Sequence, residues 1–184
     1  MRPLLVLTLF AGGVLAQNTQ IPKSIADSVA GPLSLAEGQL LSIAEAMPDA
    51  KYSFIPTVGK FDDARSFGEQ IKHVACAQFA FFNEIAGKAP PAGCEKGGPS
   101  KAATKAELIQ YLRDSFDYGN KVIGMVNQNP LARVEGRYAG PSTRLGIAVI
   151  AVWHITDHYG QLVEYLRMNG IVPPPTQKYG LQVR

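Results

Sequence analysis

The chain has 184 residues, of which 46% are hydrophobic and 18% are charged, and its formal net charge is +3. This length suits one compact domain and is too short for two of ordinary size, and the composition is globular rather than disordered. Basic and acidic residues are interspersed, without a run rich in lysine and arginine. We therefore expect no nucleic-acid partner and no binding to an acidic membrane surface.

The first sixteen residues have the pattern of a secretory signal peptide. Arg2 provides a positive charge, an apolar run follows from Leu4 to Leu15, and Ala16 is a small residue at the expected cleavage position. The alternative is a buried N-terminal helix or a membrane anchor, but the run is too short to cross a bilayer comfortably. We expect cleavage after Ala16, export to the periplasm or the exterior, and no stable membrane insertion afterwards.

Proline and glycine divide the rest of the chain into four long segments, none of which shows a sustained period-two pattern. This pattern predicts an all-α fold, a four-helix bundle with long connections. The predicted helices run from about Ser34 to Ala46 (with an alternative start near Ser24), from the expected N-cap Asp63 to Ile85, from Thr104 to about Val126, and from the expected N-cap Ser142 to Asn169. The predicted organisation is a signal peptide at 1–16, a lead-in at 17–32, the bundle at 33–174 and a C-terminal tail at 175–184.

The chain has two cysteines, Cys76 and Cys94. Export would place them in an oxidising compartment, where an even number of cysteines permits a disulfide. A bridge closing this short loop would stabilise the fold by about 3 kcal/mol in the chain-entropy model. The alternative is a buried free thiol at Cys76 and an exposed one at Cys94. We favour the bridge, because an exposed thiol is a liability outside the cytoplasm.

The fourth segment carries two of the three histidines, His154 and His158. They are one helical turn apart and share a face with Gln161 and Tyr165. This face is the apolar side of an amphipathic helix, so both imidazoles should point inward. Histidines at positions i and i+4 are found in metal-binding helices, because both imidazoles can reach one ion.

The second segment carries the third histidine, His73, at the edge of its apolar stripe. The small residues Ala77 and Ala80 lie beside it and leave room for a ligand pocket. A buried imidazole without a partner costs about 1–3 kcal/mol, and one divalent ion could satisfy all three. Three protein ligands leave positions open for water or substrate, as in catalytic sites. The alternative is three core histidines with ordinary hydrogen bonds.

Residues 65–75 (RSFGEQIKHVA) and residues 154–167 (HITDHYGQLVEYLR) carry a resemblance to a known family. They look like the second helix and the last conserved helix, respectively, of DinB-like proteins. Residues 44–48 (AEAMP) and 169–174 (NGIVPP) match the family between the first two helices and at its usual ending. The resemblance covers roughly residues 34–174, and the order and spacing of these stretches are more specific than any one of them.

The resemblance implies a four-helix bundle that holds a divalent metal ion with one histidine of the second helix and two of the last. These roles correspond to His73, His154 and His158. Imidazole nitrogens suit several transition metals, and we expect zinc or nickel. The relatives include metal-dependent hydrolases and bacillithiol- or mycothiol-dependent S-transferases, and the resemblance also implies a homodimer.

These expectations lead to an exported metal-dependent hydrolase that acts on a small molecule. Glu69 and Asp157 are the candidates for proton transfer, and Ala77, Gln161 and Tyr165 for lining the pocket. Export favours a hydrolase over a thiol-dependent S-transferase, because the low-molecular-weight thiols are mainly cytoplasmic. A non-catalytic protein that binds metal or a small ligand, and a structural bundle without metal, are the remaining alternatives.

Overall fold

The computed structural model describes residues 21–60 and 63–174. The predicted signal peptide, the first part of the lead-in and the C-terminal tail lie outside the described residues. The elements in chain order are α1 (Ile25–Ala46), η1 (Asp49–Lys51), α2 (Phe67–Ile85), η2 (Cys94–Lys96), α3 (Lys105–Val122), η3 (Ile123–Asn127), β1 (Arg133–Val134), β2 (Ser142–Thr143) and α4 (Arg144–Met168). The predicted all-α, four-helix architecture is confirmed, with one two-residue antiparallel ribbon, β1–β2, before α4.

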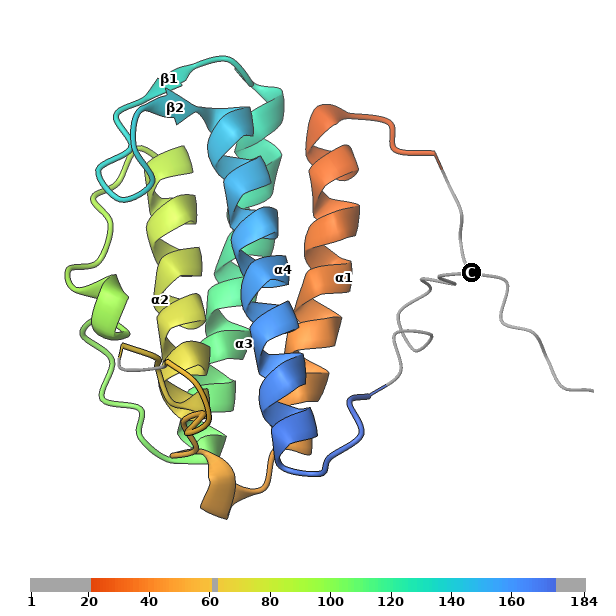
Figure 1. The fold of residues 1–184 in the computed structure, drawn as a ribbon. Coiled ribbons are helices and arrows are strands. Elements are labelled where there is room, and N and C mark those ends of the chain that lie inside the picture. Colours follow the sequence, from red (N-terminus) through yellow and green to blue (C-terminus); the bar gives the residue numbers. More distant parts are fainter. Residues whose placement is uncertain (1–20, 61–62, 175–184) are drawn as a thin grey trace, which may run out of the picture.

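The four helices form a ring in which α1 contacts α3 and α4, and α2 contacts the same two helices from the other side. Figure 1 shows that α2 and α3 run in the same direction, opposite to α1 and α4. The connection between α2 and α3 must therefore return along the bundle, and α2 with its 19 residues is about 28 Å long. This return segment, residues 86–104, runs along the outside of α2 and carries η2 (Figure 1).

The N-cap of the second helix lies three residues after the expected N-cap Asp63. Ser66 is the N-cap, and its hydroxyl accepts a hydrogen bond from the Glu69 N–H, while the Glu69 carboxylate accepts one from the Ser66 N–H at 2.7 Å. This reciprocal capping box satisfies two backbone donors that the first turn would leave unpaired. The prediction of Asp63 was wrong because a serine followed three residues later by glutamate is a stronger start signal than an isolated aspartate.

The fourth helix is capped by Thr143 rather than by the expected Ser142. The Thr143 hydroxyl accepts a hydrogen bond from the Gly146 N–H at 3.0 Å. Ser142 pairs instead with Val134 in the β1–β2 ribbon. The C-terminal end of α4 agrees with the predicted helix end at Asn169. Gly170 follows with φ +71°, and the Ile171 N–H donates a hydrogen bond to the Leu166 carbonyl oxygen.

The first helix starts at Ile25, near the earlier of the two expected starts, and continues through Pro32. Proline inside a helix costs about 3 kcal/mol, because it removes a backbone hydrogen bond. Burial of Val29 and Leu33 on either side of Pro32 opposes this cost, and so does the cap at Ser24. Part of the segment predicted as a lead-in is therefore helical.

The core is one large cluster to which all four helices contribute, for example Leu33, Ile71, Phe116 and Ile155. Each of these side chains is fully buried. Among the described residues, we find no helix with both the length and the apolar character needed to cross a membrane.

Candidate metal centre

Four contacts show how α4 lies along α2 and the residues just before it. They join Arg65 to Tyr165, Gln70 to His158, His73 to His154, and Gln78 to Ala151. The partner number falls as the residue number rises, which is the register of two antiparallel helices. This register places the one histidine of α2 opposite the two histidines of α4.

The three histidines form one cluster. One ring nitrogen from each of His73, His154 and His158 lies within 4.8 Å of the other two. The Nε2 atoms of His73 and His154 are 3.1 Å apart. His73 and His158 are buried, with 4% and 6% of their surface exposed, and His154 is half-buried. The inward orientation expected from the helical pattern is thus observed.

Hydrogen bonds define the proton position on two of the three rings. The Nδ1 of His73 is 2.8 Å from the Cys94 carbonyl oxygen, and the Nδ1 of His158 is 2.6 Å from the Gln70 Oε1. A carbonyl or amide oxygen only accepts hydrogen bonds, so each Nδ1 must donate. In a neutral imidazole the Nε2 then carries a lone pair, which is the atom a metal ion binds.

The third ring lacks such a partner. The Nδ1 of His154 is buried and has no hydrogen-bond partner among the described residues. If this Nδ1 carries the proton, the Nε2 lone pairs of His154 and His73 face each other at 3.1 Å, an arrangement that a cation between them would stabilise. Two nitrogens bound to one ion at about 2.0–2.1 Å lie about 2.8–3.4 Å apart for bond angles from about 90° to about 109°. The observed distance therefore fits two ligands of one ion.

All three imidazoles have lowered pKa values. Burial is the main cause for each, and it lowers the pKa of His154 to about 3 and that of His158 to about 4, with the neighbouring histidines adding to the effect. The pKa of His73 is also lowered by burial, and its hydrogen bond to Cys94 partly opposes this shift. The rings are thus neutral near pH 7, the form that binds metal.

Glu69 and Asp157, the candidates for proton transfer, form hydrogen bonds with residues other than the three histidines. The Glu69 carboxylate is part of the capping box, and its hydrogen bonds to Ser66 lower its pKa. Asp157 is exposed on α4 and accepts a hydrogen bond from the Gln161 Nε2 at 2.9 Å. The roles assigned to Glu69 and Asp157 remain predictions, and Gln161 lies on the exposed side of α4 rather than on the inward face.

The two other residues expected to line the pocket are buried. Ala77 lies in the main core cluster, one turn beyond His73. Tyr165 stacks edge-on against Phe54, and its hydroxyl donates to the Arg65 carbonyl oxygen at 2.9 Å. Tyr165 therefore ties α4 to the segment just before α2.

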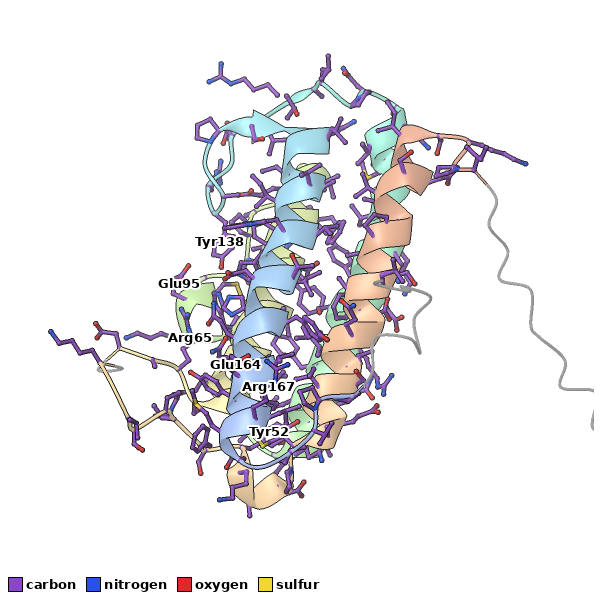
Figure 2. All side chains as sticks on the ribbon, turned by 45° about the vertical axis from the view of Figure 1, so that its right-hand side comes forward. Tyr52, Arg65, Glu95, Tyr138, Glu164 and Arg167 are labelled. Atoms are coloured by element: carbon purple, nitrogen blue, oxygen red, sulfur yellow. A yellow bond between two sulfur atoms is a disulfide. The ribbon has the colours of Figure 1, made fainter. Side chains whose placement is uncertain are left out.

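The structure adds several polar residues that the sequence did not single out. Arg65 donates two hydrogen bonds to the Glu95 carbonyl oxygen and pairs with its carboxylate at 3.0 Å. Tyr138 packs edge-on against Phe81, which packs edge-on against His154. Figure 2 shows Tyr138, Glu95 and Arg65 in a row beside α4. The cation of Arg65 contributes to the low pKa of all three histidines.

Of the missed residues, Gln70 had a readable signal, because it lies three positions before His73 and so on the same helical face. The Cys94 carbonyl had none, since every residue has a backbone carbonyl. The predicted disulfide between Cys76 and Cys94 is present in the structure and brings that carbonyl to the site.

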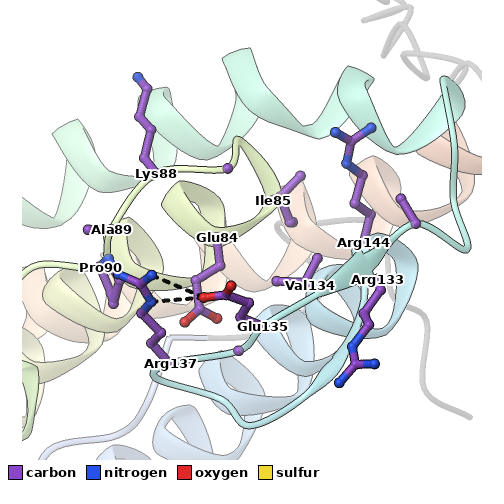
Figure 3. Close-up of a pocket in the computed structure, with 13 residues that line it drawn as sticks. Glu84, Ile85, Lys88, Ala89, Pro90, Arg133, Val134, Glu135, Arg137 and Arg144 are labelled. Atoms are coloured by element: carbon purple, nitrogen blue, oxygen red, sulfur yellow. Dashed lines mark hydrogen bonds and ion pairs between the residues drawn. The ribbon is translucent and has the colours of Figure 1, made fainter.

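Two cavities lie outside the cluster. One, of about 360 Å³, is lined by Arg65, Glu69 and Glu95 together with Asp63, Ala64 and Lys96. The other, of about 340 Å³, lies between the end of α2 and the β1–β2 ribbon and is lined by Glu84 and several arginines (Figure 3). None of the three histidines lines either cavity. The first shares Arg65 and Glu95 with the row beside the histidines, so it is the better candidate for access to them.

Comparison with known proteins agrees with this geometry. The profile of the DinB superfamily matches residues 33–162, which is most of the chain and includes all three histidines. Comparison with curated proteins gave no match. The chain, with its four-helix fold and its cluster of three histidines, belongs to the DinB superfamily.

Proposed function

We propose that this protein binds one divalent metal ion through His73, His154 and His158, with zinc or nickel as the expected ion. One observation carries the proposal. The Nδ1 atoms of His73 and His158 donate to the Cys94 carbonyl and to Gln70, which leaves a lone pair on the Nε2 of each ring within a cluster of three histidines. Outer partners of this kind fix the tautomer and the ring orientation of metal-binding histidines.

We further propose that the site is hydrolytic. When bound, such an ion supplies Lewis acidity and lowers the pKa of water. The residues of the chain fix the ligands: the Cys94 carbonyl and Gln70 hold the protons at Nδ1, and burial keeps the rings neutral. Burial also raises the pKa of the Tyr138 hydroxyl, and its hydrogen bond to Glu95 adds to this shift, so the hydroxyl stays protonated at the place where we expect a small polar substrate to enter, beside Arg65 and Glu95.

Metal binding is tested on protein stripped with chelator, reloaded with zinc or nickel and freed of excess metal by gel filtration. Elemental analysis should give one ion per chain for the wild type. The substitutions His73→Ala, His154→Ala and His158→Ala should each abolish this binding. Gln161→Ala, which changes an exposed residue on α4, serves as the control and should retain the ion. Unchanged metal content in the three histidine variants would show that the ion, if any, is bound elsewhere.

Hydrolysis is tested with a panel of ester, amide and thiol-transfer substrates, each assayed with stripped and reloaded protein. Turnover of an ester or amide that depends on metal and disappears in His154→Ala supports the hydrolase. Thiol transfer would indicate an S-transferase instead. One bound ion without turnover on any substrate would leave a metal-binding protein without the hydrolytic role.

We also propose that the protein is exported. The basis is the pattern of residues 1–16, and the disulfide between Cys76 and Cys94 supports it, because such bridges persist in oxidising compartments. The N-terminal sequence and mass of protein recovered outside the cytoplasm test this directly. Export with cleavage predicts a chain beginning at Gln17, whereas an intact N-terminus in the cytoplasmic fraction contradicts it.

A further inference from the structure

The return segment 86–104 places a backbone group in the cluster of histidines. Its short helix η2 begins at Cys94, whose carbonyl oxygen accepts the Nδ1–H of His73 at 2.8 Å. The next residue, Glu95, binds Arg65 through both its carbonyl and its carboxylate. This single turn thus contacts both His73 and Arg65.

Backbone geometry brings this turn close to α2. Gly93 and Gly97 flank η2 with φ angles of +70° and +83°, a conformation that favours glycine. A Cβ on Gly98 would lie against the Cys76 Sγ, and one on Gly97 would lie against the Lys72 side chain. The turn therefore packs on α2 more tightly than any other residue type at these positions would allow.

Few apolar contacts hold the turn in this place. Cys94 belongs to a small buried cluster with Cys76 and Ala80, which is separate from the main core. Tyr111 and Tyr138 pack against both the small cluster and the main core. The covalent link is the Cys76–Cys94 disulfide. Cys76 lies three residues after His73 on α2, so the bridge joins the turn to the helical face that carries the histidine.

We infer that the Cys76–Cys94 disulfide is a positioning element of the histidine cluster: it holds the Cys94 carbonyl against His73 and thereby fixes the orientation and proton position of this ligand. The inference rests on the proposed metal-binding function and adds a role to a bridge otherwise read as structural. Carbonyl partners of metal-binding histidines act in this way, and their loss lowers metal affinity by about 10- to 100-fold.

The inference also connects the proposed export to the site. A reducing compartment would open the bridge and release the turn, whereas an oxidising one keeps it closed. The ligand set would then be fully ordered only where the disulfide forms.

The test compares the wild type with the double variant Cys76→Ser/Cys94→Ser, which cannot form the bridge and leaves no thiols to bind metal. Metal affinity is measured by calorimetry with zinc, and the helix content is checked by circular dichroism. We expect retained helices and an affinity lowered by about 10- to 100-fold. Leu33→Ala, a core truncation on α1, controls for general destabilisation, because α1 contributes no group to the cluster; its affinity should match that of the wild type.

A second measurement reports on His73 without any metal. Nuclear magnetic resonance of ¹⁵N-labelled histidine distinguishes a ring protonated at Nδ1 from one protonated at Nε2. In the oxidised wild type, His73 should carry its proton at Nδ1, and in the double variant it should exchange between the two forms. Wild-type protein reduced with a phosphine gives the same comparison without a substitution, should the double variant not fold.

These measurements distinguish failure of the proposed metal binding from failure of the positioning role of the disulfide. If the wild type binds no metal, the proposed function fails, and the spectra of His73 still decide whether the bridge positions the ring. If the double variant binds zinc within about twofold of the wild type, or if the His73 proton stays at Nδ1 after the bridge is lost, the positioning role is refuted. An equal loss of affinity in Leu33→Ala would also refute it, because general loosening would then explain the effect.

Discussion

Two regions along α2 each contain a buried polar atom that has no hydrogen-bond partner within residues 21–60 and 63–174, but the other polar groups of the two regions are arranged differently. In the first half of the helix, His73 meets His154 and His158, and the Nδ1 of His154 is unpaired among the described residues. At the end of the helix, Glu84 borders the cavity of about 340 Å³ beside the β1–β2 ribbon (Figure 3), and its Oε2 has no hydrogen-bond partner in the described part of the chain.

In the first region, polar side chains from α2 and α4 converge on one place. Its three histidines lie on two long helices, and two of the rings are held by further hydrogen bonds. The second region has a larger open volume, but half of its charged lining residues lie in loops: among them, Arg137 pairs with Glu135, and both are exposed. The candidate site in this protein is therefore identified by the arrangement of polar atoms rather than by the size of a cavity.

The largest expected difference between the regions concerns metal affinity. His158→Ala should weaken zinc binding by more than about 100-fold, because even a lost outer partner costs about 10- to 100-fold and here a ligand itself is removed. Glu84→Gln, at the cavity, should leave the affinity unchanged. Calorimetry on both variants checks this, and an equal loss in Glu84→Gln would assign the metal to the cavity.

A smaller loss of zinc affinity is expected from substitution of Gln70, one of the buried glutamines of α2. Gln70→Leu removes the acceptor for the His158 Nδ1 and should lower zinc affinity by about 10- to 100-fold. Gln78→Leu is the matched control, because Gln78 is also buried on α2 but bonds to the Ala151 carbonyl. Its affinity should equal that of the wild type. Equal affinities in the two variants would show that the bond from His158 to Gln70 does not orient the ligand.

At the cavity we expect a change in stability and none in metal binding. The Glu84 Oε1 accepts a hydrogen bond from the Tyr138 N–H at 2.6 Å. Glu84→Leu removes this acceptor and should lower the free energy of unfolding by about 1 kcal/mol. Glu84→Gln keeps an acceptor oxygen and should lose less. Urea denaturation of both variants measures the difference, and a larger loss in Glu84→Gln would mean that the charge rather than the acceptor matters.

The smallest expected effect is the response of metal affinity to mild acid. The pKa values of His154 and His158 are lowered to about 3 and about 4, and that of His73 is lowered as well, so protons compete with the ion only at a lower pH than for ordinary histidines. Zinc affinity should therefore fall by less than about tenfold from pH 7.5 to about pH 5.5 and fall steeply below about pH 4. Histidines with the ordinary pKa of about 6.5 would lose affinity already below that value. A loss of tenfold or more by pH 5.5 would show that the rings are less shielded than the structure indicates.

Local sequence determined the helices and the inward direction of the histidines. The apolar stripes of α2 and α4 repeat every 3.6 residues, and the i, i+4 spacing of His154 and His158 places both on one face whatever the rest of the chain does. The resemblance to DinB-like proteins added the expectation that His73 faces them. These features depend on neighbours within one or two turns, so they could be read without a structure.

Tertiary structure decided what completes the site. The register of α2 against α4 rests on contacts between residues 73 to 100 positions apart. Pro32 lies inside α1 because packing on both sides outweighs its local preference. The partner of His73 is a backbone carbonyl, which every residue has, and only the disulfide and the return segment select the one at Cys94. The sequence therefore determined which residues could bind an ion, and the packing of distant segments decided how they are held.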